Sequence, residues 1–304
     1  MNAQVPARWW RITRDAVRLW LDSNAFSHAG ALAFYTLFSM APVVIIAVAV
    51  IGVVLGEDAA QGQIVAQLQD LMGREAAAAV QQAVLRSRIQ ASGLLPTLLG
   101  AAALILGATT VFGQMQHALN SIWGVAARPG RGSLFGLLKT RLLSLTVVLA
   151  IGFVLLVSLL LGVALRALLH FTHQFAPGVA ALMSGGEVLV SLFASTLLFG
   201  AIFKVLPDVV LKWRDVAAGA LVTALLFSCG RYAIAAYLAY TATASTYGAA
   251  GSVVLILLWV YYSSLILLFG AAFARTLLLA HGGRIVPRNS AVRIRHEVLL
   301  EPPA

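Results

Sequence analysis

Long apolar stretches separated by short polar segments dominate the chain, and their length is the first structural signal. Six of them come near or exceed twenty mainly apolar residues, which is the length a helix needs to cross a bilayer. They do not alternate residue by residue as the strands of a membrane barrel do, and an isolated strand cannot satisfy its backbone in lipid. The predicted spans are Ala29–Leu55, Leu94–Gly113, Leu142–Leu165, Ala180–Leu206, Val216–Ala239 and Ala249–Leu277.

An amphipathic helix is predicted ahead of the first span, over residues 6–22. At about 100° per residue, one face collects apolar residues and the other collects charges. The apolar face carries Trp9, Ile12, Ala16, Val17 and Trp20, and the polar face carries Arg8, Arg11, Arg14, Asp15, Arg18 and Asp22. Such a helix lies in the membrane interface, whereas the alternative is a solvated basic leader. The lipid contacts expected at the inner leaflet are Arg8, Arg11, Arg14, Arg18, Trp9 and Trp20.

The segments between the spans complete a single membrane domain over residues 1–280. Residues 57–93 are too long for a bare connection and show helical spacing, so they predict a helical cap on the periplasmic face. Tyr240–Gly248 is short, polar and uncharged, which suits a tight turn or a re-entrant segment. Residues 281–304 are expected to form a disordered cytoplasmic tail. The predicted fold is therefore all-α and polytopic, with six transmembrane helices.

Positive charge gives this arrangement an orientation. Sixteen of the 21 Lys and Arg residues fall on the side that holds both termini, and four fall on the other side. The positive-inside rule therefore places both termini in the cytosol, as expected for a protein of the bacterial inner membrane. Five of the six tryptophans fall on the same side, where indole rings favour the interface. The exceptions are Arg231 and Trp259, which lie within spans.

Composition agrees with this class of protein. Apolar residues make up 61% of the chain and charged residues 11%, whereas soluble domains carry about 25% charged residues. A soluble globule and a disordered chain are both excluded. The net charge of +10 would suggest nucleic acid on a soluble protein. Because these charges flank spans, we expect anionic lipid as the partner and no nucleic acid; protein partners stay open.

Two ionisable residues within spans are the first functional candidates, since charge in lipid is costly. Glu187 lies one to two turns inside the fourth span, and Arg231 lies about two turns inside the fifth. The two helices are antiparallel neighbours, so the two side chains share a depth. They could line a polar cavity open to the periplasm, form a structural pair, or reach the outer interface separately.

Further candidates for that cavity lie in the first and sixth spans. Pro42 is expected to kink the first span and to free the carbonyl one turn earlier, which the Ser39 hydroxyl could satisfy. Packing alone explains a kink equally well. Trp259, Tyr261 and Tyr262 bring aromatic and hydroxyl groups to mid-membrane, where a phenol normally has a hydrogen-bond partner.

Catalytic and metal-binding patterns are not found in the sequence. The six histidines form no HExxH motif, no phosphate-binding loop occurs, and no acidic cluster is present that could hold catalytic metals. We therefore expect no enzyme activity, no cofactor and no metal site.

Four stretches resemble the YihY / virulence factor BrkB family. They are ALAFYTLFSMAPVVI from Ala31, HALNSIWGV from His117, LPDVVLKWRDVAAGALVTALLF from Leu206 and YGAAGSVVLILLWVYYSSLILLFGAAFA from Tyr247. Within them, the family-motif positions singled out are Asn120, Trp123, Tyr247, Gly248 and Gly251. The resemblance covers most of the chain from about residue 25 to 280.

The resemblance implies a six-helix inner membrane protein whose biochemical role is usually undefined. The family once carried a ribonuclease BN label, for which this sequence offers no chemistry, and some members are associated with virulence or with envelope lipid or lipopolysaccharide traffic. This chain departs from the family at Ala272, where members commonly have Glu, so a mechanism that needs that carboxylate is in doubt. The leading hypothesis is a transporter or lipid-handling protein, and the alternative is a non-transporting scaffold or assembly factor.

Overall fold

The structure is a computed structural model and describes residues 4–56, 110–128, 180–240 and 243–294, with isolated positions between residues 62 and 81. Its labelled helices are α1 (Gln4–Asp22), α2 (Ala25–Leu55), α7 (Ala180–Val205), α8 (Trp213–Tyr240) and α9 (Thr243–Ala280). A further helix covers residues 110–123. Two short strands, β1 (Val125–Ala127) and β2 (Ala291–Arg293), complete the described part.

Local signals explain where several helices begin and end. Asn24, with a φ of 53°, turns the chain between α1 and α2, and Gly124 (67°) and Gly282 (77°) follow the ends of their helices. Glycine and asparagine adopt this left-handed conformation most readily. At the start of α8, the Asp215 carboxylate accepts a hydrogen bond from the backbone N–H of Lys212 at 2.8 Å. That contact satisfies one of the N–H groups that a helix start leaves unpaired.

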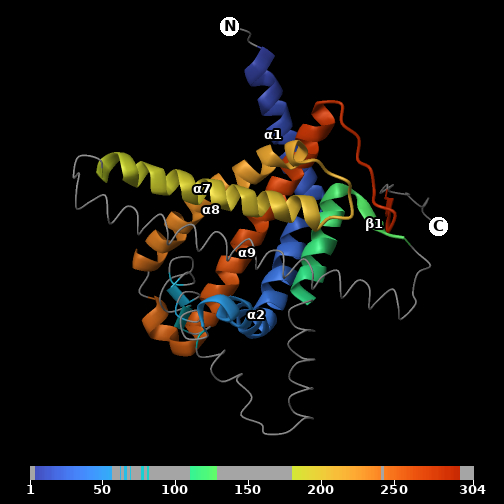
Figure 1. Cartoon of the computed structure of the whole chain (residues 1–304). Helices are drawn as coiled ribbons and strands as arrows, with labels where there is room; N and C mark the ends of the chain where they lie inside the picture. Colours follow the sequence, from blue (N-terminus) through green and yellow to red (C-terminus); the bar gives the residue numbers. More distant parts are fainter. Residues whose placement is uncertain are drawn as a thin grey trace, which may run out of the picture.

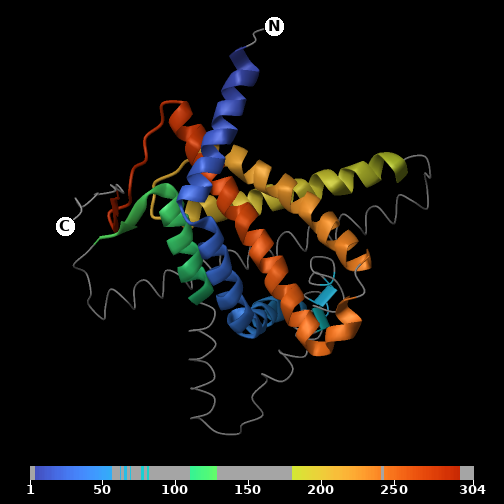
Figure 2. The ribbon, with the colours of Figure 1, turned by 180° about the vertical axis from the view of Figure 1, so that it is seen from behind.

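Helix α9 is the central element of the described structure. It contacts α1, α2 and α8 along its length, and α8 in turn contacts α7, as Figures 1 and 2 show from opposite sides. Small residues allow α8 and α9 to approach closely. A Cβ atom added at Gly219 would lie 2.5 Å from the carbonyl oxygen of Gly270 and 2.7 Å from the Cβ of Ala274. Glycine is therefore required there for packing, as in many helix pairs of membrane proteins.

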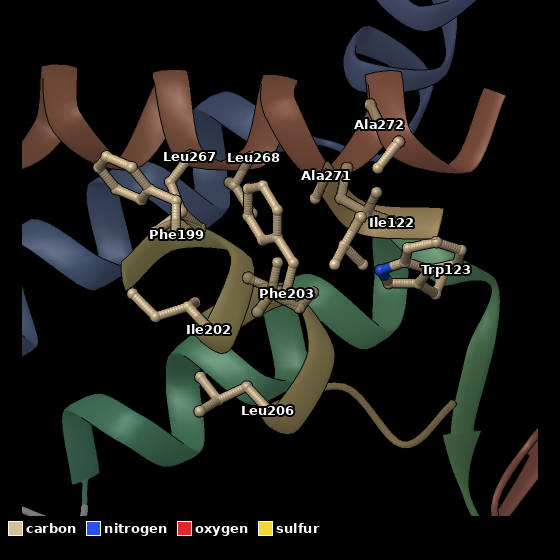
Figure 3. Packing of buried hydrophobic residues seen from close by; sticks show 14 of the residues in the cluster. Ile122, Trp123, Phe199, Ile202, Phe203, Leu206, Leu267, Leu268, Ala271 and Ala272 are labelled. Carbon is tan, nitrogen blue, oxygen red and sulfur yellow. The ribbon is translucent and has the colours of Figure 1, made fainter. Parts of the chain in front are cut away.

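A core of buried apolar side chains joins α7, α9 and the helix over residues 110–123 near the place where that helix runs into β1 (Figure 3). We call this end of the molecule the strand end. Trp123 and Phe203 are fully buried there, and Phe203 lies beside Leu268 of α9 (Figure 3). Burial of each large side chain away from water contributes roughly 2 kcal/mol, so this core stabilises the strand end.

The tail after residue 281 differs from its prediction. It was expected to be disordered, yet residues 282–294 are ordered, because β2 pairs antiparallel with β1 in the register Val125↔Arg293 and Ala127↔Ala291. Ile285 is buried as well. Backbone hydrogen bonds and one buried apolar side chain thus hold this segment, and the fold is not purely helical. Residues 295–304 lie outside the described part of the chain.

Four of the six predicted spans coincide with α2, α7, α8 and α9. Helix α8 ends at Tyr240 and α9 begins at Thr243, so residues 243–248 of the predicted connection belong to α9, and residues 241–242 lie outside the described part of the chain. The second and third predicted spans and the predicted periplasmic cap lie almost entirely outside the described residues. The count of six spans therefore stays a prediction.

The described helices carry the surface of a membrane protein. Within the described residues, Ile256–Ala280 is long and apolar enough to cross a membrane, with a mean hydropathy of 2.0, and Ser191–Val205 is a shorter apolar stretch. Large apolar side chains are exposed on α2, α7, α8 and α9. They include Phe34, Phe38, Leu189, Phe193, Leu197, Leu221, Leu225, Val254 and Leu258. A surface with so many exposed apolar residues needs lipid or a partner around it.

Candidate functional site

The strand end holds a network of polar groups around Asp208. The Asn120 side-chain amide donates to the Asp208 carboxylate at 2.9 Å, and the Asp208 backbone N–H donates back to the Asn120 carbonyl oxygen at 2.8 Å. Gln116 donates to the same carboxylate at 3.3 Å, and the Ser290 hydroxyl donates to it at 3.4 Å. The Arg288 N–H donates to the Asp208 backbone carbonyl at 2.9 Å. One aspartate therefore ties together three segments of the chain.

Asp208 was not predicted as a site residue, although Asn120 was singled out within its motif. Its partner Asn120 is 88 positions away in sequence. The residues next to Asp208 in the sequence do not indicate a partner at that separation. The available signal was an acid directly after the end of a span, in the LPDV stretch of the family-like motif. The network is structural in character, since its members mainly satisfy each other.

An open pocket of about 820 Å³ lies beside this network. It is lined by Asp22, Ser23 and Asn24 from the end of α1 and the turn into α2, by Ser121 of the helix over residues 110–123, and by Arg275 and Arg293. The two arginines come from α9 and β2. The Nη1 atom of Arg275 donates to the Ile122 carbonyl and so caps that helix.

Two histidines pack together near the same end, between α2 and the helix over residues 110–123. The rings of His28 and His117 meet edge to face with centroids 5.6 Å apart. Burial lowers the pKa of His28 below its ordinary value of 6.5, and the neighbouring His117 lowers it further. His28 therefore stays neutral at pH values where a free imidazole would begin to bind a proton. Within the described residues, no group of three or more His, Cys, Asp or Glu residues could hold a metal ion.

The predicted amphipathic helix exists as α1, but its apolar face is turned largely toward α9. Ile12 and Ala16 are buried in one cluster with Phe273. The Trp20 indole N–H donates to the carbonyl of Leu265 at 3.1 Å, and the ring of Trp9 stacks on Phe273. The Trp20 ring is therefore fixed to α9 by this hydrogen bond and is half-buried.

A second strip of α1 remains exposed. Trp10 is 70% exposed, and Val17 and Leu21 are exposed beside it; their spacing of seven and four residues puts them on one side of the helix. The arginines predicted to reach the inner leaflet, Arg8, Arg11, Arg14 and Arg18, are exposed as well. Figure 1 shows α1 extending beyond the other helices at the end of α9.

The predicted polar cavity is not confirmed in its aromatic part. Trp259 is buried against Phe227, with centroids 5.5 Å apart, and Phe227 meets Phe199 at 5.6 Å. Tyr262 lies so close to Gly230 that an added Cβ atom would collide with its ring. The rings of Trp259, Phe227 and Phe199 therefore pack the contact between α7, α8 and α9, whereas Tyr262 is half-buried. Tyr261 is half-buried.

Of the first-span candidates, Ser39 differs from its prediction, whereas the course of α2 is the one expected of a helix with an internal proline (Figure 1). The Ser39 hydroxyl donates to the carbonyl of Thr36 at 3.4 Å and not to the carbonyl one turn before Pro42. Helix α2 continues through Pro42, and its ribbon changes direction in its second half (Figures 1 and 2), as helices with an internal proline commonly do. Ser39 itself is buried.

Several predicted residues cannot be placed further. The side chains of Glu187, Arg231 and Pro42 lie outside the described residues, so the question of a Glu187–Arg231 pair is untouched. Tyr247, Gly248 and Gly251 belong to the first turns of α9, and their surroundings also lie outside. Trp123 was assigned to the interface with the other cytosolic tryptophans, but it is fully buried because the core closes around the end of its helix.

The comparisons with known proteins agree with the motifs at the strand end. The family model described as virulence factor BrkB matches residues 16–295. This chain belongs to the virulence factor BrkB family. Its match includes the helix over residues 110–123, α7, α8 and α9, and therefore every element that meets at Asp208. Ala272, where the resemblance led us to expect Glu, is fully buried in the core.

Relatives of the BrkB-family chain are named as membrane proteins. A UPF0761 membrane protein of Stenotrophomonas maltophilia is 27% identical over 282 residues, which cover 88% of this chain and 63% of the relative. One of Azotobacter vinelandii is 32% identical over 255 residues, covering 80% of this chain and 57% of the relative. The chain thus spans about three fifths of the length of the curated relatives it matches. No solved structure matches it.

Proposed function

We propose that this membrane protein is a multi-pass, non-enzymatic protein of the bacterial inner membrane, with both termini in the cytosol, that binds and moves envelope lipids. The observation that carries the proposal is the exposed side of α1. There, Trp10, Val17 and Leu21 form an apolar strip, and Arg14 and Arg18 are exposed beside it. Apolar side chains that insert next to arginines able to reach headgroups are typical of helices at an anionic membrane surface.

The arrangement of the charged segments supports this orientation. Segments expected in the cytosol meet at the strand end, where Arg128 pairs with Ser290 through its backbone at 2.9 Å and Val210 pairs with Val286 at 2.9 Å. The start of α8, with Lys212 and Arg214, adjoins them. Positive residues from distant parts of the sequence therefore gather at one end, as the positive-inside rule requires of a cytosolic face.

Lipid movement is tested in proteoliposomes that contain a phospholipid with a fluorescent headgroup. The rate at which outer-leaflet reporter exchanges with the inner leaflet is measured by chemical quenching. We expect exchange faster than in protein-free vesicles, and a slower rate for a protein carrying Arg14→Gln and Arg18→Gln together. A protein with Lys212→Gln and Arg214→Gln is the matched control, because it loses the same charge from the start of α8.

Three outcomes are decisive. Exchange that depends on the α1 arginines and not on the control pair supports the proposal. Exchange equal to that of protein-free vesicles overturns lipid movement and leaves the scaffold alternative. An exchange rate that falls equally in both double variants would show that total positive charge matters. The α1 arginines would then have no specific role in lipid movement.

A further inference from the structure

The pocket beside the Asp208 network is lined by two guanidinium groups, neither of which forms a salt bridge with a described residue. Arg275 and Arg293 both line it, and among the described residues the only salt bridge is the one between Arg14 and Asp15. Two positive charges that face one cavity repel each other, and an anion between them removes that repulsion. Asp22 also lines the pocket, so its net charge is still positive.

The hydrogen bond by which Arg275 caps the helix over residues 110–123 uses only some of the donors of its guanidinium group. One of its N–H groups donates to the Ile122 carbonyl, whereas a guanidinium carries five. Its Nε atom is buried and has no hydrogen-bond partner in the described residues. The guanidinium carbon lies 3.6 Å from the place where a Cβ atom of Gly124 would stand, so the absence of a side chain there leaves room beside it. Capping of that helix by Arg275 also does not explain why Arg293 lines the same pocket.

The other groups around the pocket suit an oxyanion. Ser23, Asn24 and Ser121 contribute two hydroxyls and an amide from two different segments. Arginine forks combined with hydroxyl and amide donors are the usual set for phosphate, which offers several acceptor oxygens at once. The volume of about 820 Å³ exceeds the need of a bare ion and falls within the usual size of small-ligand sites.

We propose that this pocket binds the phosphate group of a phosphate-bearing ligand, with Arg275 and Arg293 contacting the phosphoryl oxygens. The same chemistry can come from the headgroup of an anionic lipid or from a soluble phosphate ester. The pocket lies at the strand end, where headgroups and cytosolic solutes would both have access under the orientation proposed above. Binding is independent of whether lipid is moved, so the two proposals fail separately.

Binding is measured on the full-length protein in two arms. In the first, the detergent-solubilised protein is titrated with inorganic phosphate and with glycerol 3-phosphate, and the shift in Tm is recorded against chloride at equal ionic strength. In the second, the protein is placed in nanodiscs of phosphatidylcholine with or without phosphatidic acid, and retained lipids are identified by native mass spectrometry. Arg293→Gln is the main variant, because Arg293 is exposed and makes no hydrogen bond to the described residues through its side chain.

Arg284→Gln is the matched control, since it removes an exposed arginine of the same segment outside the pocket. We expect Arg293→Gln to weaken phosphate binding about tenfold, which corresponds to the loss of one charge-assisted contact of about 1.4 kcal/mol. Arg284→Gln is expected to leave it unchanged. Arg275→Lys keeps the charge but loses the fork, and it should weaken binding in the same direction.

The possible results distinguish a soluble phosphate from a lipid headgroup, and both from a pocket that binds no phosphate. A rise in Tm with inorganic phosphate or glycerol 3-phosphate that Arg293→Gln removes assigns the site to a soluble phosphate. Selective retention of phosphatidic acid that Arg293→Gln removes assigns it to a headgroup. Binding that is absent in both arms, or that falls equally in Arg284→Gln, overturns the proposal.

Discussion

The two halves of α9 lie in very different surroundings. From Leu265 onward, α9 is enclosed by α1, by the helix over residues 110–123, and by α7 and α8, and Leu268, Ala271 and Ala274 are fully buried. Earlier in the same helix, Val254 and Leu258 are exposed. Ile256 and Trp259 of that same stretch are buried, so the earlier part of α9 has one buried side and one exposed side, whereas the later part is enclosed on several sides.

This difference shows which positions of such a chain require particular residue types. The exposed half needs only apolar side chains, since lipid accepts any of them. The enclosed half requires particular residues, because small side chains set the distance between helices and polar groups must find partners. Substitutions should therefore cost most at the strand end and least on the exposed surface.

The largest effect is expected where Gly219 of α8 lies against the backbone of α9. Gly219→Leu places a side chain against the carbonyl oxygen of Gly270 and the Cβ of Ala274, and such overpacking costs about 3 kcal/mol or leaves no folded protein. Gly30→Ala is the matched control, because nothing lies within 4 Å of an added Cβ there. That change should stabilise by about 0.5 kcal/mol. Thermal unfolding in detergent measures both, and equal Tm values would disprove the close contact.

The second effect concerns the polar network. Asp208→Ala leaves the amide of Asn120 buried without its acceptor, which costs about 2–3 kcal/mol. Asp15→Ala is the control, because its contact with Arg14 at 3.6 Å is half exposed and surface pairs contribute under about 1 kcal/mol. Chemical unfolding curves give both values. If the two variants unfold alike, the network does not hold the segments together.

The sequence predicts these two regions to different extents. The length of the apolar stretches is enough to place α2, α7, α8 and α9, because crossing a membrane imposes a length. The register of β1 with β2 could not be predicted, since each strand has three residues and pairs across more than 160 positions of sequence. Strands this short carry no periodic signal, and composition made the tail look disordered.

The site was predicted less well than the fold, for a related physical reason. Periodicity separates apolar from polar residues, but it does not say whether an apolar residue meets lipid or protein. Trp20 and Trp123 were expected at the interface, and both are held by neighbouring helices. Asp208 became visible only through partners that are distant in sequence.

A smaller effect is expected from pH at the edge of the strand end. Because the pKa of His28 lies below 6.5 in the folded protein, the unfolded chain binds a proton more readily than the folded one just below pH 6.5. Stability is therefore full above pH 6.5 and decreases as the pH falls through the lowered pKa of His28. Tm measured from pH 8 to pH 5 should show this decrease, and His28→Gln should flatten it. A decrease of the same size in the variant would assign it to other groups.

The smallest effect on stability is expected from substituting an exposed tryptophan. Comparing it with a buried tryptophan tests directly which side chains contact lipid. Trp10 is mostly exposed on α1, whereas Trp123 is fully buried, so Trp10→Phe should change the free energy of unfolding by no more than about 0.5 kcal/mol. In vesicles of brominated lipid, which quench tryptophan emission on contact, Trp10→Phe should lower the quenched fraction because it removes an indole that faces lipid. Trp123→Phe removes an indole that lipid cannot reach, so the quenched fraction should not fall. If Trp10→Phe leaves quenching unchanged, the exposed strip of α1 faces water, and the docking of α1 on α9 then serves the protein core alone.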